Sequence, residues 1–196
     1  MKKIITISRE FGAGGGEIGR KLAQSLDFDY YDKELILMAA ARSNMDVSSL
    51  IEWDEKVPVN FGFAQSLFNF YNKPMSEKLY EAQTKVIREI GEKGRCVIVG
   101  RNAGAILREF DHTLNIYIHA DFTWRLNRMK GKMEVSSDAQ AAERIHAIDR
   151  ARRKYAEYFT HRDMAEVDLY DIMLNSSRLG TDACVETILQ LVKKNT

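Results

Sequence analysis

The sequence contains little proline, cysteine or histidine, and each scarcity excludes something. Its two prolines, Pro58 and Pro74, both fall in the one irregular stretch of the chain. Its two cysteines, Cys96 and Cys184, lie inside apolar runs, which favours buried thiols over a disulfide or a metal site. The four histidines are scattered. Without histidines and cysteines at metal-ligand spacing, a metallohydrolase is not expected.

Net charge and long apolar runs are also nearly absent. Lys+Arg 29 against Asp+Glu 28 leave a formal net charge of +1, so overall charge points to neither nucleic acid nor an anionic membrane. Any basic site must therefore be local. No apolar run approaches the roughly 18 residues of a membrane-spanning helix, and no signal peptide is recognisable, which predicts a cytoplasmic protein. The 196 residues fit one domain of ordinary size.

What the sequence does contain is a glycine cluster between a β-branched run and an amphipathic pattern. Residues 4–7 read Ile-Ile-Thr-Ile, residues 12–16 hold four glycines in five positions, and Ile18, Leu22 and Leu26 begin one helix face. Such a strand, loop and helix brings several backbone N–H groups to one point at the positive end of the helix dipole. A phosphate belongs there, although a purely structural turn is the alternative interpretation.

This loop departs from the phosphate-binding P-loop pattern G-x-x-x-x-G-K-[ST]. Aligned on that template, Arg9 takes the place of the first glycine, Gly14 of the second, Gly15 of the lysine and Gly16 of the Ser/Thr. The usual cation and the usual metal-facing hydroxyl are both missing. A phosphate bound here needs a cation from elsewhere, for which Arg9 and Arg20 are the nearest candidates.

Strand and helix patterns alternate through the rest of the chain. The expected strands are 28–32, 96–99, 114–118 and 168–175, and the expected helices are 33–42, 76–93 with Ser76 as N-cap, one reaching 107, one opening at 120–121, 136–158 and 181–192. The run at 96–99 is apolar throughout, as in a central strand buried on both faces. The alternation predicts an α/β fold, a mostly parallel five-stranded sheet with helices on both faces.

Two charged residues lie at the carboxyl ends of expected strands, where ligands bind in sheets of this kind. Arg101 comes directly after the central strand at 96–99, so it would face the same crevice as the glycine loop; a surface arginine is the alternative. Asp32 ends the strand at 28–32 and is either a helix N-cap or a site residue.

Residues 43–75 are rich in aromatic residues without clear periodicity, which suggests a cap over a pocket or a dimer contact.

Taken together in chain order, five stretches resemble the cytidylate kinase-like family of P-loop nucleoside monophosphate kinases. They are residues 5–23, 28–36, 97–102, 149–158 and 170–180. The resemblance implies a single kinase domain over 1–196 with the three-layer P-loop NTPase fold, in which 43–75 is a variable insertion on the monophosphate side and about 125–162 a helical lid. It implies transfer of the γ-phosphoryl group of ATP to CMP or dCMP with Mg²⁺, on small-molecule nucleotides alone; a homodimer is left open.

On the ATP side, the resemblance assigns the phosphates to the loop residues Gly12, Ala13, Gly14, Gly15 and Gly16, and Arg9 is the candidate cation beside them. It implies that Arg125 and Arg128, one turn apart, begin the lid over ATP, with Arg125 in a catalytic role. Glu17 would hold Mg²⁺ directly or through water, because Gly16 offers no hydroxyl.

On the acceptor side, Asp32 would open the monophosphate site. Arg101 would bind the acceptor phosphate and Asn102 stands where the family's aspartate reads cytosine. Asp149 resembles a ribose contact, and Arg152 resembles a lid arginine on the phosphates. Like Arg125, Arg101 and Arg152 would have a catalytic role, because they would supply the positive charge that Gly15 cannot. With Asn102 in place of a carboxylate, an amide with both donors and acceptors loosens base selectivity and could admit uracil.

Gly15 in place of lysine keeps two other hypotheses open, because phosphoryl transfer is catalysed mainly by positioned positive charge. One is a nucleotide-binding or regulatory protein that has lost turnover. The other is a kinase for another small phosphorylated or hydroxylated metabolite on the same scaffold.

Overall fold

The computed structural model of the chain describes residues 4–32, 73–133 and 135–194. The strands are β1 (Ile4–Arg9), β2 (Asp29–Tyr31), β3 (Cys96–Val99), β4 (Thr113–His119) and β5 (Ile172–Asn175). The helices are α1 (Gly15–Leu26), α5 (Lys73–Lys93), α6 (Ala103–Ile106), α7 (Phe122–Lys130), α8 (Asp138–Thr160), the 3₁₀ turn η1 (Val167–Leu169), α9 (Ser176–Leu179) and α10 (Thr181–Lys194). The chain divides into two compact units, the first made of residues 1–32, 87–125 and 165–196, the second of 33–86 and 126–164.

The five strands form one parallel sheet in the order β2-β3-β1-β4-β5, all within the first unit. This confirms the predicted α/β fold with its five-stranded parallel sheet. β1 is central, with Ile7 paired to Val99 of β3 on one side and to Ile116 of β4 on the other. The connections reverse direction beside β1, and in such sheets ligands bind outside the carboxyl ends of the strands at that point. The glycine loop follows β1 there.

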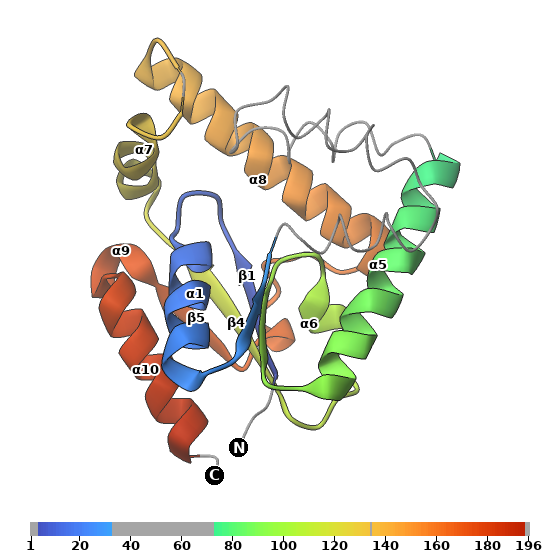
Figure 1. Cartoon of the computed structure of the whole chain (residues 1–196). Helices are drawn as coiled ribbons and strands as arrows, with labels where there is room; N and C mark the ends of the chain where they lie inside the picture. The colour runs from blue at the N-terminus through green and yellow to red at the C-terminus, as the bar shows by residue number, and fades with distance from the viewer. Residues whose placement is uncertain (1–3, 33–72, 134, 195–196) are drawn as a thin grey trace. The chain divides into compact units, whose positions relative to one another are not determined.

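The side chains of β1 point alternately to the two faces of the sheet, and helices cover both faces. Ile5 and Ile7 are buried in the main core together with residues of α1 and α10, which lie side by side along the sheet (Figure 1). Thr6 points to the opposite face, where a Cβ placed on Gly104 of α6 would lie 3.1 Å from its hydroxyl oxygen. Helices therefore cover both faces, so that strand β3 can be apolar and buried at every position.

The second unit has its own packing between the first half of α5 and the last turns of α8. The rings of Tyr80 and Phe159 stack with centroids 3.9 Å apart and planes inclined by 10°. Gln83 donates a hydrogen bond from Nε2 to the Tyr155 hydroxyl oxygen at 3.1 Å. These contacts join two helices that are far apart in the sequence.

Two of the expected element boundaries are wrong. Ser76 is not an N-cap, because α5 already includes Lys73, and Pro74 lies in its first described turn, where a missing N–H does not interrupt the helix. The strand expected over 168–175 begins only at Ile172. The turn η1 takes Asp168 and Leu169 of the expected strand, and Val167 at its start is 71% exposed. The helix expected at 33–42 and the cap at 43–75 lie outside the described residues.

The other expected elements are confirmed within two or three residues at each end. Ser137 caps α8 by accepting a hydrogen bond from the Gln140 amide. Cys96 and Cys184 are buried free thiols, as predicted. Within the part of the chain that the structure describes, no helix is long and apolar enough to span a membrane.

Candidate phosphate-binding site

The glycine loop presents backbone N–H groups at the start of α1. Gly12 and Gly14 have φ values of 81° and 86°, a left-handed conformation that residues with a Cβ adopt at a cost. The amides of Gly12, Gly14, Gly15 and Gly16 donate to no other group among the described residues. Two of these belong to the first turn of α1, whose N–H groups have no acceptor within the helix. The loop therefore offers several N–H donors to an anion, as the sequence predicts.

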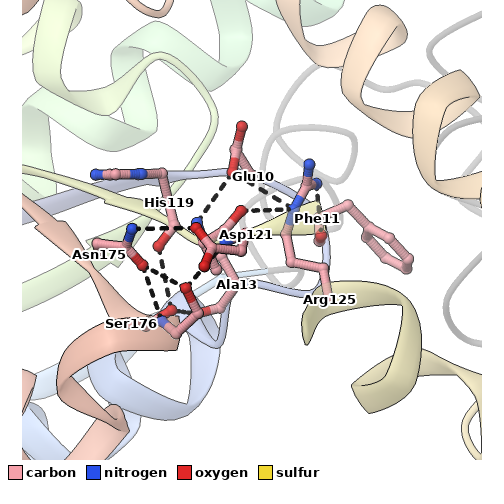
Figure 2. A network of polar contacts seen from close by, with 10 residues as sticks. Glu10, Phe11, Ala13, His119, Asp121, Arg125, Asn175 and Ser176 are labelled. Carbon is pink, nitrogen blue, oxygen red and sulfur yellow. Dashed lines mark hydrogen bonds and ion pairs between the residues drawn. The ribbon is translucent and has the colours of Figure 1, made fainter. Parts of the chain in front are cut away.

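Two carbonyl groups of the loop are fixed by donors from distant segments. Arg125 donates from Nη1 to the Phe11 carbonyl oxygen at 3.0 Å, and the fully buried Ser176 donates from its hydroxyl to the Ala13 carbonyl oxygen at 2.6 Å (Figure 2). A hydrogen bond to each carbonyl fixes the orientation of its peptide plane. The loop conformation is thus set before any ligand binds, which lowers the entropic cost of binding.

Arg125 also forms the centre of a buried polar cluster with Glu10. Its Nε donates to the Ala120 carbonyl oxygen at 3.2 Å and lies 3.5 Å from Glu10 Oε2. The same carboxylate oxygen accepts the Ala120 amide at 3.0 Å (Figure 2). The Arg125 side chain is only 7% exposed. This geometry gives Arg125 a role in holding the loop, and its predicted contact with ATP stays a prediction.

Ser176 belongs to a second set of contacts, between the ends of β4 and β5, that the sequence analysis missed. Asn175 Oδ1 accepts the Ser177 amide at 3.0 Å and so caps the short helix α9. The Ser177 hydroxyl oxygen accepts the Asp121 amide at 3.0 Å. The sequence Asn175-Ser176-Ser177 after a strand is an N-cap signal that could have located this helix. Nothing local indicates that Ser176 reaches Ala13.

Arg9, Asp32 and Tyr30 lie together beside the start of α1. Arg9 Nη2 is 3.3 Å from Asp32 Oδ1, and these side chains are 15% and 20% exposed. The Tyr30 hydroxyl donates to the Gly16 carbonyl oxygen at 3.2 Å, with Asp32 Oδ2 also at 3.3 Å. A Cβ placed on Gly16 would be 3.6 Å from Asp32 Oδ2. The structure thus brings the predicted residues Arg9 and Asp32 to the glycine loop, whereas Arg20 lies over the Tyr30 ring.

The Tyr30 hydroxyl gives a testable dependence of stability on pH. Burial raises its pKa to about 12, and the nearby Asp32 carboxylate adds to the shift. Above pH 10 the unfolded state loses this proton while the folded state keeps it, so folding stability falls between about pH 10 and pH 12. We expect Tyr30→Phe to lose less stability than the wild type over that range. Equal slopes of the unfolding free energy against pH in the two proteins would contradict this assignment.

Gly100, Arg101 and Asn102 form an unusual turn directly after β3. All three have positive φ, 79°, 59° and 54°, in a conformation that costs a residue with a side chain about 1 kcal/mol or more. Gly100 donates its amide to the Ile7 carbonyl oxygen at 2.9 Å, which ties the turn to β1. Arg101 is 8% exposed, and the Nδ2 atom of Asn102 is buried without a hydrogen-bond partner among the described residues. A strained turn with a buried guanidinium and an unsatisfied amide suits recognition of a polar, anionic ligand.

Glu17, the predicted metal ligand, faces α10. Its Oε1 accepts hydrogen bonds from Lys21 Nζ at 3.1 Å and from the Thr181 hydroxyl at 3.0 Å. Both contacts engage Oε1 of Glu17, and its predicted role in holding Mg²⁺, directly or through water, stays a prediction. No group of three or more potential metal ligands occurs among the described residues. Mg²⁺ usually binds through nucleotide phosphates and water, and those ligands do not depend on Glu17.

The remaining predicted residues lie in the second unit. Arg128 is on α7, and Asp149 and Arg152 lie three residues apart on α8, on one side of that helix. Asp149 is 9% exposed. Their contacts with a nucleotide, and the lid over about 125–162, stay predictions.

The sequence of this chain is similar to a known family over most of its length. The model of the cytidylate kinase-like family matches residues 4–178 of the sequence. The chain belongs to the cytidylate kinase-like family. The match includes the glycine loop, the turn after β3 and helix α8, and the resemblance noted in the sequence is thereby confirmed.

Solved structures agree on the fold of this cytidylate kinase-like chain. An uncharacterized protein from Eubacterium ventriosum is similar with a TM-score of 0.73 and 23% identity, over 97% of this chain and 98% of that chain. A shikimate kinase from Acinetobacter baumannii in complex with shikimate has a TM-score of 0.54 and 17% identity, over 99% and 94%. A Bacillus subtilis protein in complex with phosphorylated GDP has a TM-score of 0.55 and 11% identity, over 97% and 95%. At these identities the likeness shows the kinase fold alone. No curated protein matches the sequence.

Proposed function

We propose that this protein is an ATP-dependent phosphotransferase that phosphorylates a nucleoside monophosphate to the diphosphate. The expected acceptor is CMP or dCMP. One observation carries the proposal. The glycine loop after β1 and the turn Gly100–Asn102 after β3 lie at the carboxyl ends of two paired strands. A donor phosphate chain and an acceptor phosphate need two such neighbouring anion sites.

The donor site is suited to the phosphates of ATP. Its four glycine amides are directed by a loop whose carbonyl groups at Phe11 and Ala13 are already bound by Arg125 and Ser176. Preorganised N–H groups stabilise negative charge without having to reorient, and this lowers the barrier to transfer. When Mg²⁺ is bound with the nucleotide, it supplies further positive charge on the phosphates.

The acceptor site is suited to a phosphate and a base. Arg101 offers a planar guanidinium that can bind two phosphate oxygens at once. Asn102 Nδ2 is a buried donor to which no described residue offers an acceptor, and a cytosine or uracil base carries acceptors that could satisfy it. In the proposed reaction an oxygen of the acceptor phosphate forms a bond to the γ-phosphorus. The bond to the oxygen bridging the β- and γ-phosphates breaks, and ADP leaves with that electron pair.

A second candidate function is nucleotide binding without turnover. Gly15 stands at the P-loop lysine position, and loss of that charge favours a protein that binds ATP but transfers nothing. It would share the donor site and differ only in the acceptor reaction.

A coupled assay of ADP release with CMP, dCMP, UMP and other phosphorylated or hydroxylated acceptors tests the proposal. We expect turnover with CMP or dCMP above the rate of ATP hydrolysis without acceptor. Measurable ATP binding with no turnover on any acceptor would instead support the second candidate. Turnover with a hydroxylated metabolite alone would retain the kinase and overturn the nucleotide acceptor.

A further inference from the structure

The place where a P-loop lysine would begin is occupied by the side chain of Arg9. A Cβ built on Gly15 would lie 2.8 Å from Arg9 Cβ and 2.9 Å from Arg9 Cγ. Real Cβ atoms are not found that close to other atoms, and the obstructing atoms are the stiff first part of the arginine rather than its tip. The two positions therefore exclude each other: while Arg9 lies here, residue 15 has to be glycine.

The guanidinium of Arg9 lies between the two proposed phosphate sites. Its Nη1 lies against Gly100, at a position that a Cβ on that residue would occupy. Its Nη2 pairs with Asp32, whose other carboxylate oxygen is close to Gly16 in the first turn of α1. The charged group is thus beside the N–H donors of the glycine loop and next to the turn that carries Arg101.

The surrounding charges explain why a cation is needed there. Asp32 places a carboxylate next to the start of α1, where a phosphate would be repelled by it. Arg9 neutralises that charge in a partly buried position, where electrostatic interactions are stronger than in water. A guanidinium carries five N–H groups in a fixed fork, so one group can bridge a carboxylate and a phosphate at the same time.

We propose that Arg9 supplies the positive charge that the P-loop lysine gives in other kinases, with the cation moved from position 15 to the end of β1. Gly15 is then the consequence of this exchange and not a sign of a decayed site. Asp32 is a positioning residue that holds the guanidinium. The inference rests on the proposed function, because it requires nucleotide phosphates in the glycine loop.

Binding measurements on the full chain test this without relying on turnover. Calorimetry at one salt concentration, with ATP and with inorganic tripolyphosphate, compares the wild type with Arg9→Gln and with the control Arg108→Gln. Arg108 is exposed and precedes β4, on the side of the amino-terminal ends of the strands. We expect Arg9→Gln to weaken both probes by a similar factor, roughly 10- to 100-fold. We expect the control to change neither.

An exchange variant separates charge from packing. Arg9→Gly with Gly15→Lys removes the obstructing atoms and returns the cation to position 15, so we expect it to recover most of the affinity for both probes. The matched variant Arg9→Gly with Gly15→Met has a side chain of similar length without the charge, and it should stay weak. Gly15→Lys alone should lower the melting temperature, because Arg9 still occupies the space.

These measurements separate a failure of the role proposed for Arg9 from a failure of the proposed function. Unchanged ATP affinity in Arg9→Gln, or a loss for ATP without one for tripolyphosphate, would overturn the role of Arg9 and leave the proposed function standing. Equal affinities of the Lys and Met exchange variants would also overturn it. Binding of neither probe by the wild type would sink the proposed function, and the inference with it.

Discussion

Replacing Arg101 with alanine is expected to lower kcat/KM for the monophosphate acceptor roughly 10³-fold, while the affinity for ATP stays unchanged. The reason is its position. Arg101 is a buried guanidinium, 8% exposed, directly after a central strand and in a backbone conformation that costs energy to maintain. A charge held in that way is worth most where another charge develops during the reaction, because low dielectric strengthens the interaction.

Steady-state kinetics with varied CMP or dCMP, together with calorimetry of ATP, measure this effect. Arg101→Lys keeps the charge but not the two-pronged geometry, so it should recover only part of the activity. Arg108→Ala serves as the control, since this exposed arginine lies before β4, away from the carboxyl ends of the strands. Acceptor kinetics in Arg101→Ala that match those of the control would remove Arg101 from the acceptor site.

Replacing Arg125 with alanine is expected to destabilise the protein by about 3–5 kcal/mol. The change removes the donors to the Phe11 and Ala120 carbonyl oxygens and leaves the Glu10 carboxylate, 18% exposed, without its counter-charge. For a chain of this size that corresponds to a melting temperature lower by on the order of 10 °C. Because the Phe11 carbonyl is then released, the glycine loop should also bind ATP more weakly.

Thermal melts monitored by circular dichroism check this result against Arg178→Ala. Arg178 is also close to a carboxylate, 3.4 Å from Asp121, but its side chain is 76% exposed. Exposed pairs contribute about 0–1 kcal/mol, so this variant should melt close to the wild type. Combining Arg125→Ala with Glu10→Gln should cost less than the sum of the two single changes, because no charge is left buried alone. Equal melting temperatures for Arg125→Ala and Arg178→Ala would rule out the structural role.

The parts of the fold that the sequence predicted well are those set by local patterns. The apolar run of β3 and the helical spacing in α10 depend on residues that are neighbours along the chain, and both were located within a few residues. The predicted strand at 168–175 was too long because Leu169 and Tyr170 come shortly before the apolar run of β5. Only the sheet decides where this strand begins, since β5 pairs with β4 from Ile172 onward.

The same division applies to the candidate site. The sequence alone determined the glycine loop, the arginine after the central strand and the absence of a lysine at position 15, because glycine, arginine and strand patterns are each recognisable locally. Only the tertiary structure decided which residues hold the glycine loop in its conformation and which cation lies beside it. Ser176 reaches Ala13 across 163 positions, Arg125 reaches Phe11 across 114, and Arg9 excludes any side chain at Gly15. Such contacts depend on how the carboxyl ends of parallel strands converge in space, and sequence distance carries no information about that convergence.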